Sequence, residues 1–471
     1  MEGINMSKKV RVIALAMSMF LTVGVLSVGC GGPGQDLDVS VSIESIQKKY
    51  DASLYSYSGE PVTITMSHWD SDGATLERAV LETELKAFKN RYPTINVELD
   101  IISDYEKTYA TNISTNNLHD VFMVSDGVFA NWSTGGKMVN LTPYIQASEI
   151  VNLDGMYDSV VTRYRYDSAS GLTGVGEQLV MPRDISAHVM YYNKDYFAAK
   201  GVELPPSDRI MTIDEAVKMW QALTERDGDY IETYGVAGLV MEGLVWSAGG
   251  DFINDSRTGF PTDPADIAAL KKAYQFIQDA YYKYEITPPA EFSSGMDPAT
   301  LFSLQKVATV IAGSWNVASF RTLSFDWDIA YVPAFPEALV KNAWSGSVGY
   351  AISNSCKNKE AAWKLVEYIG SPEGQEILAA TGFQFPLYEN IGLSKEYLDR
   401  EVKLKPNNYE VFIHSAAKQP AGTWTYTKST QWKELGYDMF SEYLLNNNAA
   451  NRWDVDRFLA RVKEAVNQYL A

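Results

Sequence analysis

Four tryptophans in this sequence stand at the ends of apolar runs or beside glycines. They are Trp69, Trp246, Trp315 and Trp344. The apolar C–H faces of sugar rings pack on flat aromatic rings, so these indoles are candidates for stacking against a sugar. The alternative for each ring is an ordinary buried side chain, because large aromatic residues are common in protein cores.

Four charged residues close to these tryptophans or to predicted strand ends could hydrogen-bond the hydroxyls of such a ligand. They are Asp70, Asp126, Arg183 and Asp184. Carboxylates accept hydrogen bonds from hydroxyls, and a guanidinium donates to them. Together with the four tryptophans they form the predicted solute-binding set. Arg183 alone gives weak support for an acidic sugar.

No catalytic residues are predicted. A secreted glycoside hydrolase would need two carboxylates about 5 to 9 Å apart, and nothing in the sequence pairs two such groups. The sequence also contains no G-x-S-x-G elbow, no G-x-x-x-x-G-K-[ST] phosphate loop and no H-E-x-x-H motif. These absences favour a binding protein over an enzyme.

No cofactor or metal site is expected either. The only cysteines are Cys30 and Cys356, and the four histidines show no ligand spacing. Residues 70–73 resemble the start of a calcium loop but lack its later ligands and its final Glu, so a turn that caps a helix is the better interpretation.

The composition is strongly acidic, with a formal charge of −19. Nucleic acid is therefore an unexpected partner, because phosphate binding needs clustered Lys and Arg. Such a charge favours a soluble monomer.

The N-terminus has the pattern of a lipoprotein signal peptide. Lys8, Lys9 and Arg11 precede an apolar run over residues 12–28, and Gly29-Cys30 follows. We expect cleavage after residue 29 and lipidation of Cys30, although Ser27 stands where Leu is usual. The alternative is an uncleaved anchor helix. Both interpretations place the body outside the cytoplasm, on the outer face of a Gram-positive cell or in the periplasm of a Gram-negative one. Residues 30–60 are expected to be a flexible tether.

Strand and helix patterns alternate from residue 61 onward. Strands are predicted over 62–67, 95–102 and 120–125, with helices between them, which indicates an α/β sheet flanked by helices. Ligands of such sheets bind beyond the carboxyl ends of the strands. Trp69, Asp70 and Asp126 stand at such ends, and so does Trp315, which follows a predicted strand over 308–312 and the turn at Gly313-Ser314. A capping box at residues 212–215 starts a helix that carries Trp220, which we expect in the core.

Several ordered segments resemble one protein family. Residues 179–206 (LVMPRDISAHVMYYNKDYF, then Gly201 and Pro205-Pro206), 301–320 (LFSLQKVATVIAGSWNVASF), 328–333 (DIAYVP), 344–353 (WSGSVGYAIS) and 371–375 (SPEGQ) occur in the order found in the family-1 extracellular solute-binding proteins of bacterial ABC importers. The resemblance covers about residues 61–471.

This resemblance implies a two-lobed α/β fold of the periplasmic-binding-protein type (type II), with a mainly parallel sheet flanked by helices in each lobe and three hinge crossings. The expected N-lobe is 61–183 plus 333–352, and the expected C-lobe is 184–332 plus 353–471. It also implies ABC permease subunits as partners and, through them, an ATPase.

The predicted function is capture of a sugar or oligosaccharide by closure of the hinge, for delivery to the permease. Alternatives are a binding protein for a peptide, polyamine or other small polar molecule, a secreted glycoside hydrolase, and a purely structural surface protein.

Overall fold

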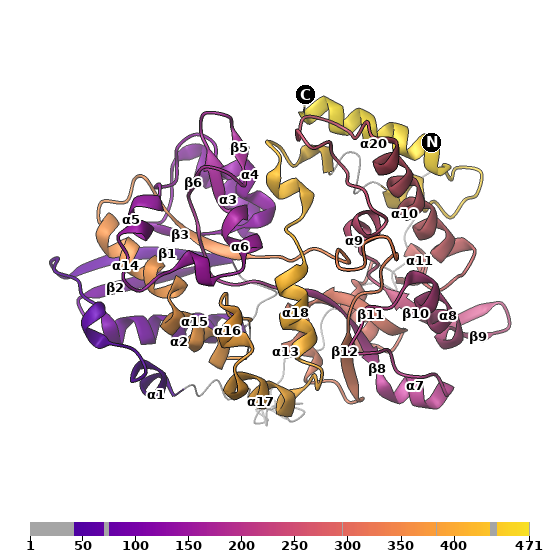
Figure 1. Ribbon diagram of the computed structural model, residues 1–471, viewed down its shortest axis with the longest axis horizontal. Helices are drawn as coiled ribbons and strands as arrows, with labels where there is room; N and C mark the ends of the chain where they lie inside the picture. Colours follow the sequence, from indigo (N-terminus) through magenta and orange to yellow (C-terminus); the bar gives the residue numbers. More distant parts are fainter. Residues whose placement is uncertain (1–41, 70–74, 294, 383, 434–439, 471) are drawn as a thin grey trace, which may run out of the picture. The chain divides into compact units, whose positions relative to one another are not determined.

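Two five-stranded sheets organise the part of the chain that the computed structural model describes, which is residues 42–69, 75–293, 295–382, 384–433 and 440–470 (Figure 1). These residues all lie within one unit of the chain, residues 39–471. Each sheet, with the helices packed on it, is called a lobe below.

The first sheet has the strand order β2-β1-β3-β13-β7. Its strands are β1 (Val62–Trp69), β2 (Ile95–Ile102), β3 (Val121–Ser125), β7 (Met181–Pro182) and β13 (Val348–Ile352). Strand β1 runs parallel to β2 and β3, whereas β13 runs antiparallel to β3 and β7.

The second sheet has the order β12-β8-β11-β10-β9. Its strands are β8 (His188–Asn193), β9 (Glu225–Asp227), β10 (Tyr230–Ala237), β11 (Val307–Gly313) and β12 (Trp327–Ala330). Only β10 and β11 pair in parallel. A small antiparallel sheet holds β4 (Arg165–Asp167), β5 (Leu172–Thr173) and β6 (Glu177–Gln178).

Both large sheets are therefore mixed, and the expectation of mainly parallel sheets was wrong. The physical reason lies in the crossings between lobes. The chain enters strands β8 and β13 directly from the other lobe. Strand β8 runs antiparallel to β11, and β13 runs antiparallel to β3, whereas β11 and β3 are each reached from within their own lobe.

Helices cover both faces of the first sheet, with α2 and α15 on one side and α3, α4 and α6 on the other in Figure 1. The helices of this lobe are α1 (Ile43–Gln47), α2 (Thr75–Arg91), α3 (Tyr105–Thr115), α4 (Asp126–Trp132), α5 (Thr142–Gln146), α6 (Asp158–Arg163), α14 (Lys359–Gly370) and α15 (Pro372–Ala380), with 3₁₀ turns η1 (Ala52–Leu54) and η2 (Leu153–Gly155).

Helices also cover both faces of the second sheet. The helices that follow β8 and β10–β12 are α7 (Lys194–Lys200), α8 (Ile213–Leu223), α9 (Met241–Ser247), α10 (Pro264–Tyr282), α11 (Ala290–Ser293), α12 (Pro298–Ser303), η3 (Ser314–Asn316) and α13 (Val317–Phe320). The last part of the chain adds α16 (Glu389–Gly392), α17 (Lys395–Leu404), α18 (Glu410–Lys418), η4 (Thr423–Tyr426), α19 (Phe440–Tyr443) and α20 (Val455–Leu470).

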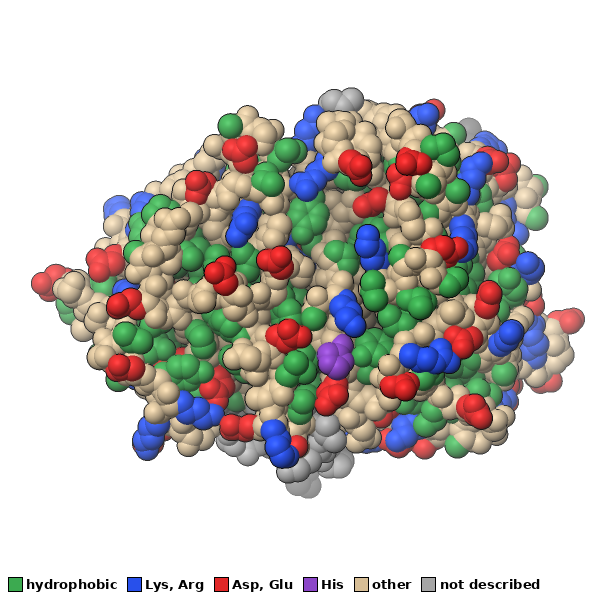
Figure 2. Space-filling view, viewed as in Figure 1, with side chains coloured by type: hydrophobic (Ala, Val, Ile, Leu, Met, Phe, Trp, Pro, Cys, Tyr) green, Lys and Arg blue, Asp and Glu red, His purple; other side chains and the backbone are tan. Residues whose placement is uncertain are grey.

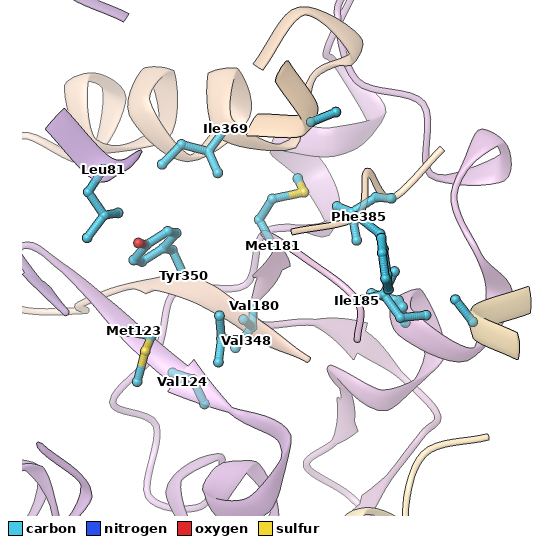
Figure 3. Close-up of a cluster of buried hydrophobic side chains, with 14 of the residues drawn as sticks. Leu81, Met123, Val124, Val180, Met181, Ile185, Val348, Tyr350, Ile369 and Phe385 are labelled. Carbon is cyan, nitrogen blue, oxygen red and sulfur yellow. The ribbon is translucent and has the colours of Figure 1, made fainter. Parts of the chain in front are cut away.

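The chain passes between the two sheets three times. The first passage joins β7 to β8 through residues 183–187, and the second joins β12 to β13 through residues 331–347. The third leads from α15 to α18, which contacts β8. Ile185 of the first passage forms an antiparallel bridge with Phe385 of the third, and these two side chains lie side by side in Figure 3.

The packing of two segments differs from the expected partition of the chain. Helices α14 and α15 contact α2 and strands of the first sheet, although residues 353–471 were expected to belong to the second lobe. Residues 43–47 were expected in a flexible tether, but they form helix α1, whose Ile43 and Ile46 are buried beside α15. Burial of these two apolar side chains holds this end of the expected tether on the first lobe.

The buried apolar side chains form two clusters. One fills the first lobe and continues onto the α12, α13 and α18 side of the second sheet, and Figure 3 shows its part around Met181, Tyr350 and Ile369. The other lies between the second sheet and helices α8, α9, α10 and α20. Trp220 is fully buried in this second cluster, which confirms its expected place in the core.

Among the described residues, no helix combines the length and apolarity needed to cross a bilayer. The predicted signal peptide and Cys30 lie outside these residues.

Candidate functional site

A cavity of about 290 Å³ opens where elements of the two lobes meet. Its lining residues come from the ends of strands β1 and β3, the first turns of α2 and α4, the start of β13, all three passages between the lobes and the turn after β11. They are Trp69, Glu77, Ser125, Asp126, Asp184, Ser186, Trp315, Trp344, Gly346, Ser347, Val348 and Gln384. Five of the eight predicted solute-binding residues are therefore placed in one cavity.

Three of the predicted tryptophans line this cavity. Trp69 is the last residue of β1, Trp315 lies in η3 directly after β11, and Trp344 lies on the second passage. Trp315 is 45% exposed, as expected for an aromatic residue at a strand end that faces a cleft. A Cβ on Gly313 would lie 2.1 Å from this ring, so glycine is needed there for the indole to fold back over the chain.

His188 fixes two of these indoles. Its ring centroid lies 5.3 Å from that of Trp315 and 4.5 Å from that of Trp344. Its Nδ1 donates to the carbonyl oxygen of Trp344 at 2.8 Å. Burial lowers the pKa of His188 to about 4, so at neutral pH the imidazole is uncharged and acts as a positioning ring.

Asp126 begins α4 directly after β3. Its carboxylate accepts a hydrogen bond from Nη1 of Arg163 at 2.6 Å. The same Nη1 also donates to the carbonyl oxygen of Ser345 on the second passage. Burial raises the pKa of Asp126, and the charge of Arg163 opposes this rise. The positive charge of Arg163 thus offsets part of the free-energy cost of burying the Asp126 carboxylate.

Asp184 lies on the first passage. Burial raises the pKa of its carboxyl to about 7, while Arg183 and the Val348 amide act in the opposite direction. The group therefore changes charge near neutral pH, at the wall of the cavity.

Glu77 is a lining residue that the sequence analysis did not single out. Its Oε1 accepts from Trp69 Nε1 at 3.3 Å and lies 2.8 Å from His68 Nε2. His68 Nδ1 in turn lies 2.9 Å from the hydroxyl of Tyr350 on β13. Glu77 stands in the first turn of α2, the helix that follows the predicted site residues Trp69 and Asp70 in the chain, and that position was its only signal.

Arg183 does not line the cavity, although it was predicted to bind the solute. Its side chain is fully buried, and its Nε and Nη2 donate to Glu84 Oε2 at 3.1 and 2.8 Å. Its Nη1 donates to Asp184 at 3.4 Å. Arg183 thus lies behind the carboxylates that face the cavity.

Trp246 lines a second cavity of about 320 Å³. Its Nε1 donates to Asp251 at 3.2 Å, and Thr423 Oγ1 donates to the same oxygen at 2.8 Å. The remaining predicted residue, Asp70, lies outside the described residues.

Ser125, the last residue of the strand predicted over 120–125, also lines the cavity, next to the predicted Asp126. Three more polar lining residues were not predicted, namely Ser186, Ser347 and Gln384. The motif segments at 179–206 and 344–353 contain Ser186 and Ser347, and that position was the signal for both. Gln384 had no signal beyond its place in the third passage.

The described residues contain no group of three or more His, Cys, Asp or Glu side chains arranged to hold a metal ion. The site combines indole rings and carboxylate groups at a junction between the two lobes.

Residues 69–376 match the family of bacterial extracellular solute-binding proteins. This protein belongs to that family. The match covers the first two passages between the lobes. It also covers all six residues that bring tryptophan or carboxylate groups into the cavity: Trp69, Glu77, Asp126, Asp184, Trp315 and Trp344.

Curated relatives of this family member are distant and partial. A binding protein of Brucella abortus is 24% identical over 60% of this chain and 66% of its own length. The arabinooligosaccharide-binding protein of Halalkalibacterium halodurans is 26% identical over 45% of this chain and 48% of its own. The maltooligosaccharide ABC transporter solute-binding lipoprotein of Streptococcus pneumoniae R6 is 25% identical over 50% and 53%. The matched part thus spans less than two thirds of each relative.

Solved structures of similar fold cover more of the chain. An ABC substrate-binding protein of Listeria monocytogenes in complex with cycloalternan has a TM-score of 0.72 at 20% identity, covering 86% of this chain and 98% of its own. The GacH receptor of Streptomyces glaucescens has a TM-score of 0.67 at 17% identity, covering 87% and 98%. These similarities confirm the expected two-lobed, periplasmic-binding-protein-like fold.

Proposed function

We propose that this protein captures a carbohydrate between its two lobes and delivers it to the permease of an ABC importer. One observation carries the proposal. Trp69 at the end of a first-lobe strand and Trp315 just after a second-lobe strand line the same cavity, and three carboxylates are among its other lining residues. Indole faces and hydrogen-bond acceptors at a lobe junction are the groups that a sugar ring needs.

The relatives point the same way, because two of the three described above are named for oligosaccharides. Closure of the lobes would remove water from the cavity and strengthen each hydrogen bond to the solute. A receptor with a dissociation constant of about 1 μM needs about 8 kcal/mol, which a few stacking and hydrogen-bonding contacts supply. No chemical step is required of the carboxylates.

We also propose that Cys30 carries the lipid anchor that keeps the protein at the outer side of the cell membrane. More than one acyl chain makes such anchoring stable. Expression in a bacterial host with labelled palmitate should label the wild-type protein in the membrane fraction. The Cys30→Ala variant should be unlabelled and released, and equal labelling of both proteins would contradict this proposal.

A thermal-shift screen tests the carbohydrate proposal. The ligands are neutral mono- to tetrasaccharides, amino acids, short peptides and polyamines. A rise in the midpoint temperature with one or more sugars, followed by a calorimetric titration, is the expected result. Stabilisation by peptides or polyamines and by no sugar would contradict it. Incubation with labelled oligosaccharides should give no cleavage products, whereas products would indicate a hydrolase.

A further inference from the structure

The described residues that line the 290 Å³ cavity include three carboxylates and no lysine, arginine or histidine. The carboxylates are Glu77, Asp126 and Asp184. Their relative exposures are 4%, 8% and 3%, so they are buried in the wall of the cavity and little screened by bulk water. All the charged side chains among these lining residues are therefore negative.

Two arginines lie behind this wall, and both are committed to protein groups. Arg183 binds Glu84 through Nε and Nη2, and its Nη1 contacts Asp184. Arg163 binds Asp126 and both the carbonyl and the hydroxyl oxygen of Ser345. Both guanidinium groups are fully buried, so a solute could recruit neither without breaking these bonds.

The charges around the cavity do not balance. The two arginines face four buried carboxylates, namely Glu77, Glu84, Asp126 and Asp184, which leaves a formal excess of two negative charges. With Asp184 protonated, an excess of one remains. Burial raises the pKa of Glu84, Asp126 and Asp184, and the charge of a neighbouring carboxylate adds to each rise.

The helix ends that could attract an anion are also occupied. Glu77 stands in the first turn of α2, and Asp126 is the first residue of α4. The partial positive charge at each helix N-terminus is thus already matched by a carboxylate of the protein itself.

We propose that this cavity selects its sugar by charge, accepting neutral and amino sugars and rejecting sugars that carry a carboxylate, sulfate or phosphate. This inference rests on the proposed function. An acidic group in the cavity would be buried next to carboxylates without a counter-ion. An ammonium group would find both carboxylates and indole faces, which attract cations.

Gln384 adds an acceptor that needs a donor. Its Oε1 is buried and has no hydrogen-bond partner among the described residues. A hydroxyl or an ammonium can donate to this oxygen, whereas a carboxylate, sulfate or phosphate dianion cannot.

The single charge sign is a property of this cavity and not of the surface in general. On the face shown in Figure 2, lysine and arginine side chains are interspersed with aspartate and glutamate. The second cavity, which contains Trp246, is lined by Arg257 and Lys341 as well as by aspartates.

The test compares matched sugars on the full chain. The neutral sugar that binds most tightly in the screen is titrated beside its amino and uronic-acid analogues, for example glucose, glucosamine and glucuronate. We expect the amino sugar to bind at least as tightly as the neutral one, and the uronate to bind at least about 100-fold more weakly. A uronate that binds within threefold of the neutral sugar, or uronates as the only ligands, would overturn charge selection while leaving a sugar receptor. If no sugar of any charge binds, the proposed function itself fails.

A pair of variants on one helix locates the origin of the selection. Glu77→Gln removes a lining charge, and Glu82→Gln removes an exposed charge from the same helix. We expect the Glu77→Gln variant to reduce the neutral-to-uronate affinity ratio by about tenfold, and the Glu82→Gln variant to leave it unchanged. An equal ratio in both variants contradicts the role of the lining carboxylate. Asp126→Asn serves as a second lining variant should Glu77→Gln fail to fold.

Discussion

The carboxylate of Asp184 accepts a hydrogen bond from the backbone amide of Val348, with nitrogen and oxygen 3.0 Å apart. Asp184 lies on the first passage between the lobes, and Val348 is the first residue of β13, where the second passage ends. The hydroxyl of Ser347 donates in turn to the carbonyl oxygen of Asp184 at 2.7 Å. A residue that lines the cavity therefore ties two of the three passages together.

Asp184→Asn should change how stability depends on pH. Burial raises the folded-state pKa of Asp184 from 3.8 to about 7, so the folded protein holds this proton more tightly than the unfolded chain does. The free energy of unfolding must then fall as pH rises through 7, by about 1 kcal/mol between pH 6.5 and 8 from this group alone. Urea unfolding at several pH values measures it.

The asparagine variant isolates this contribution, because its Oδ1 can still accept from Val348. Glu84 and Asp126, whose pKa values burial also raises, add a slope of the same sign in both proteins. The difference in slope between wild type and variant is therefore the quantity to compare. Equal slopes would mean that Asp184 titrates outside this range.

Removal of an indole should weaken solute binding far more than it weakens the fold. Trp315 is 45% exposed, so Trp315→Ala removes a stacking face without opening a cavity in the core. We expect a loss of affinity of about 10- to 100-fold, equal to about 1 to 3 kcal/mol, and little change in the unfolding midpoint. Titration calorimetry with the best sugar measures it.

The matched control for this substitution is Tyr230→Ala. Tyr230 is a 59% exposed aromatic residue on β10 that lies outside the residues lining the cavity. The affinity of the Tyr230→Ala variant for the sugar should equal that of the wild-type protein. A loss of affinity in the tyrosine variant as large as that in the tryptophan variant would argue against stacking at Trp315.

Arg183→Met should destabilise the fold itself. It leaves Glu84 and Asp184 buried without their cation, and an unpaired buried charge of this kind costs about 3 to 5 kcal/mol. Arg226→Ala breaks an exposed pair with Glu285 and should cost less than about 1 kcal/mol. Urea unfolding measures the free energy of unfolding of both variants. A similar decrease in the two would show that the buried carboxylates Glu84 and Asp184 do not depend on Arg183 for their stability.

The strands and helices of the first lobe could be predicted because local patterns define them. The strand predicted over 95–102 has the bounds of β2, and α3 is one of the helices expected between the predicted strands. Strand direction could not be predicted in the same way. Apolar residues in β8 and β13 indicate that these strands are buried. Their direction relative to their neighbours depends on the lobe from which the chain enters them, which local patterns do not show.

Tertiary packing also decides which predicted residues meet. Trp246 and Trp344 both lie beside glycines or serines in the sequence, yet they line different cavities. Arg183 and Asp184 are adjacent in sequence, but their side chains differ in role, because Arg183 turns inward to Glu84 while Asp184 faces the cavity. The amphipathic pattern of α14 indicates a buried face but does not indicate which sheet would cover it.

Gly346 offers the sharpest test that the space between the indoles is where solute binds. It lines the cavity on the second passage, and a Cβ built there would lie 2.8 Å from Ser186 Oγ, 3.2 Å from the ring of Trp344 and 4.0 Å from that of Trp315. The nearest atom ends a rotatable side chain, so Gly346→Ala should fold after a small shift of Ser186. The added methyl group occupies volume that a sugar ring would need between the two indoles, and we expect at least about a tenfold loss of affinity. An alanine variant with wild-type affinity and wild-type unfolding midpoint would place the bound solute elsewhere, with the second cavity at Trp246 as the next location to examine.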